Sequence, residues 1–139
     1  MPTIVFATNN AHKIAEVREI LAGTGIEVRT LADMGLDVDP PETGDTFVAN
    51  ARQKARFVHE KTGLVCVADD SGLEVDALDG APGVHSKRFS PEGTAAANNK
   101  LLLSKLEGEE DRAARFVCVI AVVGNGVERT AAGECEGII

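Results

Sequence analysis

The sequence predicts one α/β domain, because strand-like and helix-like patterns alternate along its 139 residues. The chain opens with a short apolar segment at residues 3–7, continues with helical spacing, and reaches a second apolar segment at residues 26–30. A further apolar run at residues 64–68 ends in two adjacent aspartates. A chain of this length buries a real core as a single domain, and no linker or repeat divides it.

Three helices are predicted from apolar residues that recur at helical spacing. The first covers residues 12–22 and is closed by Gly23. The second begins at a cap formed by Asp45 or Thr46, and the third covers residues 94–106. The apolar positions are Ile14, Val17, Ile20 and Leu21 in the first helix, Phe47, Ala51, Ala55 and Val58 in the second, and Leu102, Leu103 and Leu106 in the third.

The last third of the chain predicts a β-hairpin. Residues 116–123 form the most apolar strand-like run, and Asn125-Gly126 favours a type I′ turn into a returning strand at residues 127–134. Earlier, residues 36–46 are rich in Asp, Pro and Gly and are predicted to be a loop. The chain stops at two apolar residues, Ile138-Ile139, which we interpret as the end of a fragment.

Net charge and hydropathy argue against two classes of protein. The formal net charge of -8 argues against a broad nucleic-acid surface, which needs a basic stripe to neutralise phosphates. No apolar run approaches the roughly 20 residues of a membrane-spanning helix. The N-terminus lacks the basic patch and apolar stretch of a signal peptide. We therefore expect a cytoplasmic protein that binds neither nucleic acid nor membrane.

The cysteines and histidines are dispersed along the chain. We expect the cysteines to be buried, reduced thiols, because a zinc site would need a closer group of ligands. We expect the histidines to lie at the surface, since their spacing suggests no catalytic triad. The residues concerned are Cys66, Cys118 and Cys135, and His12, His59 and His85.

A polar segment joins the first predicted strand to the first predicted helix. A helix N-terminus offers unpaired backbone N–H groups and the positive end of the helix dipole, which together favour a phosphate group. Lys13 adds a positive charge, and Thr8 and Asn10 add hydrogen-bonding side chains. The alternative is a capped helix start with a solvated lysine. The segment consists of Thr8, Asn9, Asn10, Ala11, His12 and Lys13, and it matches neither the P-loop nor the Gly-x-Gly-x-x-Gly pattern.

Two adjacent acids, Asp69 and Asp70, follow the apolar run at residues 64–68. Neighbouring carboxylates repel each other unless a cation or a proton intervenes, and a hard cation such as Mg²⁺ prefers carboxylate and phosphate oxygens. If the strand continues, the two side chains point to opposite faces, so at most one of them faces a given ligand. The alternative is an Asp-Ser-Gly turn with solvated acids. Ligand sites collect at strand ends in α/β folds, which favours a functional role.

An acidic loop at residues 40–45 leads into the second predicted helix. Glu42 in this loop is a candidate metal ligand, and Lys54 on the helix is a candidate phosphate contact. The alternative is a solvated loop with a solvated lysine. Two further cations, Lys87 and Arg88, follow the turn predicted at residues 80–83, and we interpret them as plain surface.

Taken in chain order, these segments resemble the inosine triphosphate pyrophosphatase family, whose members hydrolyse deaminated purine nucleoside triphosphates. The resemblance covers essentially the whole chain and rests on several ordered motifs. The matching residues are Thr8-Asn9-Asn10-Ala11-His12-Lys13 with Glu16, Glu42-Thr43-Gly44-Asp45-Thr46-Phe47 with Asn50, Ala51, Lys54 and Ala55, Ala68-Asp69-Asp70-Ser71-Gly72-Leu73, Gly80-Ala81-Pro82-Gly83 with Ser86, Arg88 and Phe89, and Arg115-Phe116.

The resemblance implies a fold, a reaction and a set of site residues. The fold is a mixed central sheet flanked by helices, with two lobes, and the protein is a homodimer. The reaction cleaves ITP, dITP or XTP between the α and β phosphates, with Mg²⁺ as cofactor, and gives a nucleoside monophosphate and pyrophosphate. Asp70 matches the general base and Mg²⁺ contact, and Glu42 is the candidate second metal ligand. Residues 8–13, Lys54 and Ser71 match substrate contacts.

The chain departs from the family pattern in two places. Pro41 precedes Glu42 where many relatives carry two acids. The family also continues past residue 139 with Phe-Gly-Tyr-Asp-Pro and Ser-His-Arg motifs that help to read the purine base. Without a counterpart to these motifs, no residue here is assigned to base selectivity, and we expect a C-terminally truncated family domain. Two other readings are a nucleotide-binding module without turnover and a structural α/β domain with incidental acids.

Overall fold

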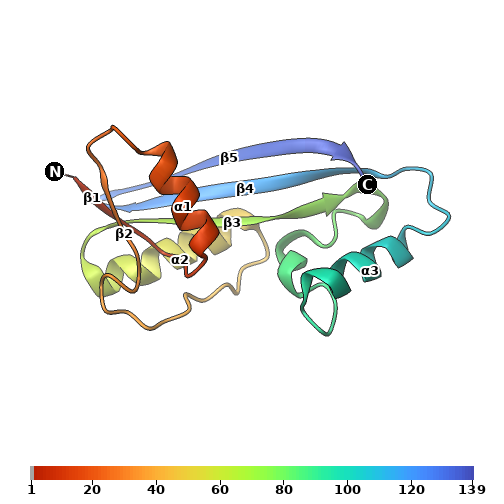
Figure 1. The fold of residues 1–139 in the computed structure, drawn as a ribbon, viewed down its shortest axis with the longest axis horizontal. Helices are drawn as coiled ribbons and strands as arrows, with labels where there is room; N and C mark the ends of the chain where they lie inside the picture. The colour runs from red at the N-terminus through yellow and green to blue at the C-terminus, as the bar shows by residue number, and fades with distance from the viewer. Residues whose placement is uncertain (1) are drawn as a thin grey trace. The chain divides into compact units, whose positions relative to one another are not determined.

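The computed structural model describes residues 2–139 and contains a five-stranded mixed sheet (Figure 1). The strand order is β2-β1-β3-β4-β5, with β1 parallel to both β2 and β3. The α/β class with helices beside a mixed sheet is therefore confirmed. The elements are β1 (Thr3–Phe6), α1 (Ala11–Ile20), β2 (Glu27–Arg29), α2 (Phe47–Thr62), β3 (Val65–Val75), the 3₁₀ turns η1 (Asp76–Leu78) and η2 (Gly83–Arg88), α3 (Ala95–Lys105), β4 (Ala113–Gly124) and β5 (Val127–Ile138).

The chain forms two compact units. The first unit runs to Asp70 and includes Val119–Ala131, and the second unit comprises Ser71–Cys118 and Ala132–Ile139. The first unit contains β1, β2, α1 and α2, while the second contains α3 and both 3₁₀ turns. The strands β3, β4 and β5 contribute residues to both units. Asp70 is thus the last residue of its segment in the first unit.

The core of the first unit lies between its parallel strands and α2. Val5 of β1 and Cys66 of β3 are fully buried, as are Ala55 and Val58 of α2. These two residues, like Ala51, follow the helical spacing expected from the sequence, so α2 presents one buried face to the sheet. Because these elements share a buried core, the functional side chains that α2 and the strands carry are held at fixed positions.

The second unit has its own core, formed by Val75, Leu102, Leu106 and Ala114. Leu103 was expected on the same apolar side of α3, but its side chain is 52% exposed. At 3.6 residues per turn, Leu102 and Leu106 lie one above the other, and Leu103 is turned about 100° away. Leu103 therefore faces solvent.

Two other predicted apolar positions are also exposed. Ile20 lies at the end of α1 and is 75% exposed, because helical spacing puts it on the flank of the stripe formed by Ile14 and Val17. Cys135 lies on β5, whose residues are all exposed. Burial of the thiols is therefore confirmed for Cys66, only partial for Cys118 and wrong for Cys135, although all three are free thiols.

Capping and turn residues in the sequence predict several element boundaries correctly. Thr46, one of the two predicted caps of α2, accepts a hydrogen bond from the Ala49 N–H at 3.1 Å. Asn125 and Gly126 both adopt positive φ, at 53° and 73°, as a type I′ hairpin requires. Gly124, just before them, approaches β3 so closely that an added Cβ would lie 2.7 Å from the Val65 Cα. Among the described residues, no helix is both long and apolar enough to cross a membrane.

Candidate active site

The segment between β1 and α1 forms a capped helix start. Asn10 is the N-cap of α1, and its Oδ1 accepts hydrogen bonds from the N–H groups of His12 and Lys13 at 3.0 and 3.2 Å. The Thr8 Oγ1 accepts from the Asn10 N–H at 3.1 Å, and the Asn9 Nδ2 donates to the Val38 carbonyl at 2.9 Å. The capped start is confirmed, and the Asn10 side chain takes up the N–H groups of His12 and Lys13.

Lys13 is not a solvated lysine. Its Nζ donates to the Asp69 Oδ2 at 2.6 Å, and the two side chains are 23% and 8% exposed. The partners are 56 residues apart in the chain, and they meet because β1 and β3 are neighbouring parallel strands. The structure thus brings the segment of residues 8–13 and the pair of aspartates together within the first unit.

The pair Asp69 and Asp70 is part of β3 rather than a turn. The strand continues through both acids to Val75, and they are 5% and 6% exposed. The interpretation as a turn with solvated acids is therefore wrong, because strand pairing overrides the local turn preference of Asp-Ser-Gly. Neighbouring residues of a strand point to opposite faces, and accordingly Asp69 bonds to α1 while Asp70 bonds to α2.

Asp70 is held by a neutral amide. The Asn50 Nδ2, on the buried face of α2, donates to the Asp70 Oδ2 at 3.1 Å. Burial raises the pKa of the Asp70 carboxyl, while the hydrogen bond from Asn50 and the nearby Lys54 ammonium oppose that rise. The carboxylates of Glu42 and Asp69 act in the raising direction. The result is a buried carboxylate with more affinity for a proton than an exposed aspartate has.

Lys54 is also buried and paired, so the reading as a solvated lysine is wrong. Its Nζ donates to the Glu42 Oε1 at 2.6 Å, and the side chains of the pair are 9% and 28% exposed. Because both ions act on the pKa of Asp70, the pair lies within electrostatic reach of that carboxylate. The structure therefore groups Glu42, Lys54 and Asp70, which are far apart in the sequence.

Asn50 is the site residue that sequence reasoning did not select. Its place in the motif does not single it out, yet the residue is 2% exposed and its side chain reaches both a loop and β3. The signal was present, since Asn50 follows Phe47 by three residues and precedes Lys54 by four. That spacing places two polar residues on the face of α2 that packs against the sheet.

The remaining predicted surface residues mostly lie at the surface. His12, His85, Lys87 and Arg88 are exposed, as expected. His59 is only partly buried, and its Nδ1 is 2.6 Å from the Leu64 carbonyl oxygen. None of these side chains is among the groups that shift the pKa of Asp70.

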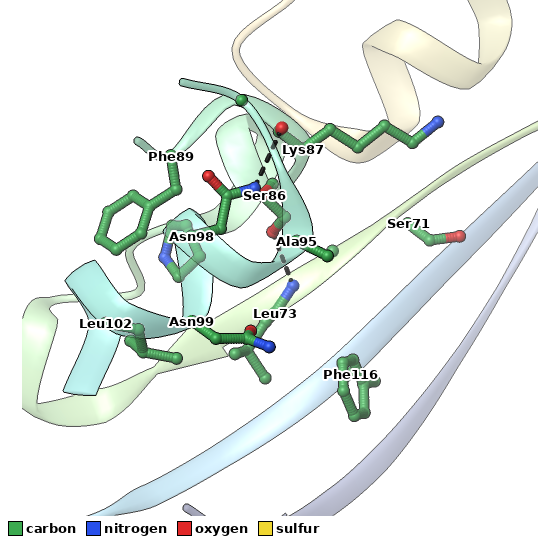
Figure 2. A pocket seen from close by; sticks show the side chains of 13 residues that line it. Ser71, Leu73, Ser86, Lys87, Phe89, Ala95, Asn98, Asn99, Leu102 and Phe116 are labelled. Carbon is green, nitrogen blue, oxygen red and sulfur yellow. Dashed lines mark hydrogen bonds between the residues drawn. The ribbon is translucent and has the colours of Figure 1, made fainter. Parts of the chain in front are cut away.

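A separate hollow in the second unit is mainly apolar (Figure 2). Its volume is about 540 Å³, and its lining includes Ser71, Leu73, Phe89, Leu102 and Phe116. Figure 2 shows the Phe89 and Phe116 rings among these side chains. The lining contains no carboxylate.

The geometry of the first unit suits reactions on a strongly anionic ligand. The two adjacent acids each have an ammonium group near them: Lys13 bonds to Asp69, and Lys54 acts on the buried Asp70 carboxyl, whose pKa is raised by burial. The N-terminus of α1 adds partial positive charge beside Lys13. Within residues 2–139, no three or more His, Cys, Asp or Glu side chains group as a metal cage.

Comparison with known proteins gives a consistent family. The sequence profile of the Ham1 family matches residues 4–139. The dITP/XTP pyrophosphatase of Desulfotalea psychrophila is 47% identical over 141 residues, which cover 100% of this chain and 63% of that protein. The dITP/XTP pyrophosphatase of Desulforamulus reducens is 49% identical over 140 residues, which cover 98% of this chain and 70% of that protein.

A solved structure agrees with the sequence comparisons. The HAM1 protein from Coxiella burnetii superposes with a TM-score of 0.93 and is 40% identical. The match covers 100% of this chain and 73% of that one. The chain spans 63% and 70% of the length of the two curated relatives named above.

Proposed function

Because the chain belongs to the Ham1 family, we propose that it hydrolyses deaminated purine nucleoside triphosphates to the monophosphate and pyrophosphate. The substrates are ITP, dITP and XTP, in keeping with the dITP/XTP pyrophosphatases that it matches. The observation that carries the proposal is the buried Asp70 carboxylate, held by Asn50 beside the Lys54–Glu42 pair.

Asp70 acts as the general base. It removes a proton from a water molecule whose oxygen bonds to the α-phosphorus, and the bridging oxygen leaves with pyrophosphate. A pKa that burial raises makes this carboxylate a stronger base, and the hydrogen bond from Asn50 keeps the ionised form available. No covalent intermediate is needed, because positioning and charge neutralisation supply the remaining rate enhancement.

The triphosphate binds at residues 8–13. The N-terminus of α1 and the Lys13 ammonium attract its negative charge. Thr8, Asn9, Asn10, Ala11 and His12 are the other proposed contacts of the phosphate groups. Lys54 contacts a further phosphate oxygen, and Ser71, the next residue after Asp70, contacts the substrate.

Mg²⁺ is the proposed cofactor, and the donor set fits it. Asp70 and Glu42 offer the hard carboxylate oxygens that Mg²⁺ prefers, and the Glu42 charge raises the pKa of the Asp70 carboxyl. These two residues would hold the ion. When bound, Mg²⁺ neutralises phosphate charge and so lowers the barrier to attack. Lys54 keeps Glu42 in place through their ion pair.

Three broader features belong to the same proposal. Both compact units are parts of one nucleotide pyrophosphatase domain, since the family profile spans them without a break. We propose a cytoplasmic location, as the sequence leads us to expect, and a homodimer, as the resemblance implies. Analytical ultracentrifugation tests the dimer, and a species with the mass of one chain would contradict it.

The deciding experiment measures pyrophosphate release from inosine triphosphate in the presence of Mg²⁺. We expect steady release with ITP and XTP and much slower release with ATP. Calorimetric titration with the same nucleotides runs in parallel. Binding without release would favour the nucleotide-binding module, and absence of both would leave a structural domain.

The phosphate site is tested by replacing Lys13. We expect Lys13→Ala to raise KM for ITP by about tenfold to hundredfold, because a charge-assisted contact to phosphate is lost. The change also removes an ammonium from beside Asp69, so the double variant Lys13→Ala with Asp69→Asn serves as the control. It removes both partners and should show the same raised KM. An unchanged KM in both variants would contradict the phosphate site.

A further inference from the structure

Asn50 has a buried side-chain amide with both ends engaged. The Oδ1 accepts from the Gly44 N–H at 2.7 Å, and the Nδ2 donates to the Asp70 Oδ2 at 3.1 Å. The first contact leads to the loop that carries Glu42, and the second to β3. One side chain therefore joins the loop, the helix α2 and the strand.

The direction of this amide follows from its partners. A backbone N–H can only donate, so the oxygen of Asn50 must face Gly44. The Nδ2 then faces Asp70, where an ionised carboxylate can accept. A flipped amide would place two donors together at Gly44 and two acceptors together at Asp70. The network thus admits one orientation, and Asn50 cannot rotate to relieve a change at either end.

Two neighbouring residues of α2 hold the same loop. The Gln53 Oε1 accepts from the Thr43 N–H at 2.8 Å, and its Nε2 donates to the Thr43 Oγ1 at 2.9 Å. Lys54 holds Glu42, as described above. The spacing i, i+3 and i+4 puts Asn50, Gln53 and Lys54 on adjoining positions of the helix surface. Asn50 differs from the other two because its second contact is the Asp70 carboxylate.

The loop also approaches α2 too closely for a side chain at residue 44. A Cβ on Gly44 would lie 2.8 Å from the Ala49 Cβ and 2.9 Å from the Asn50 Oδ1. The first of these contacts is with a short side chain that cannot move away. The loop therefore packs closely against Asn50 at Gly44, and this close packing limits movement of the Asn50 amide.

We propose that Asn50 is a positioning residue that directs the Asp70 carboxylate and couples it to the loop carrying Glu42. The inference rests on the proposed function, in which Asp70 is the base and Glu42 helps to hold the metal. With Oδ2 held by Asn50, Oδ1 is the carboxylate oxygen that faces the attacking water. A base aimed in this way loses little freedom when the substrate binds.

Three variants separate the two ends of the amide. Asn50→Asp keeps an acceptor for the Gly44 N–H but replaces the donor to Asp70 by a carboxylate. Asn50→Ala removes both ends. Gln53→Ala is the matched control, because it loosens the same loop at Thr43 and leaves the contact with Asp70 intact.

Two measurements report separately on the Gly44 contact and the Asp70 contact of the Asn50 amide. Amide hydrogen exchange reports the loop, and we expect exchange at Gly44 to become about tenfold faster in Asn50→Ala but not in Asn50→Asp. Steady-state kinetics report Asp70, and we expect kcat per folded enzyme to fall about tenfold to hundredfold in both Asn50 variants, with KM changed by no more than about twofold. Gln53→Ala should keep kcat and speed exchange at Thr43.

The inference is overturned if Asn50→Asp keeps the wild-type kcat per folded enzyme, or if Gly44 exchange is the same in Asn50→Ala and wild type. Failure of the proposed function is distinguishable, since wild-type protein would then release no pyrophosphate. In that event a thermal double-mutant cycle between Asn50→Ala and Asp70→Ala decides the inference, because it needs no turnover. Additive shifts in Tm would overturn the coupling, and non-additive shifts would support it.

Discussion

Replacing Asp70 by Asn is expected to lower pyrophosphate release from ITP by about 10²–10⁴-fold, the usual contribution of a general base. Asn has nearly the same shape and can still accept the hydrogen bond from Asn50, so the fold stays intact. KM should change far less than kcat, because the phosphates bind at residues 8–13. Initial rates with saturating ITP and Mg²⁺, with circular dichroism to check folding, measure the effect.

The same variant is expected to be more stable than wild type near neutral pH. Burial raises the folded-state pKa of Asp70 above that of the unfolded chain, so the folded protein binds this proton more tightly. The stability from that proton is present below the unfolded pKa and is lost as pH rises through the folded pKa. A neutral Asn avoids this loss, and a gain of about 1 kcal/mol would raise Tm by roughly 3–5 °C.

Asp79→Asn is the control for both measurements. Asp79 is an exposed acid with φ of 53°, a conformation that Asn also adopts readily. We expect it to keep the wild-type rate and Tm. Wild-type turnover in Asp70→Asn would refute the role of Asp70, and a clearly lowered Tm would contradict the claim that its buried charge is destabilising.

Replacing Lys54 by Met is expected to destabilise the chain and to abolish most turnover. The Lys54 side chain is 9% exposed, and removing one partner of a buried pair costs about 3–5 kcal/mol. Because Glu42 is 28% exposed and is partly solvated, we expect about 2 kcal/mol here. The uncompensated charge of Glu42 also acts directly on Asp70. Urea unfolding monitored by circular dichroism measures the loss.

The double variant Lys54→Met with Glu42→Gln tests whether the ion pair is the cause. Removing both charges leaves no uncompensated ion, so most of the lost stability should return. Turnover should stay low, because the proposed metal ligand and phosphate contact are both gone. Equal stability of the single and double variants would show that packing of the Lys54 side chain, rather than its charge, matters.

Elements set by local chemistry could be predicted from the sequence. Thr46 caps α2 because its side chain reaches an N–H three residues ahead, a relation that the sequence displays directly. Asn125-Gly126 likewise specifies its own turn. The apolar residues of α2 recur at helical spacing, and its buried face followed from them.

What could not be predicted depends on contacts between distant segments. Lys13 and Asp69 are 56 residues apart, and the sequence around either residue does not indicate that the other is its partner. Asp-Ser-Gly has a local preference for a turn, but the pairing of β3 with its neighbouring strands overrides that preference. Asn50 cannot be selected from the sequence, because a neutral amide in a helix gives no signal of function and its role depends on the two segments that its side chain connects.

Asp69 and Asp70 are identical residues whose environments differ because neighbouring positions along β3 face opposite sides of the sheet. One bonds to a lysine of α1 and the other to an amide of α2. Inserting a single residue upstream in β3 would exchange the two faces for every following side chain, and inserting two would restore them. The site therefore depends on the number of residues that precede the two acids in β3. We expect insertion of one residue there to reduce activity far more than insertion of two.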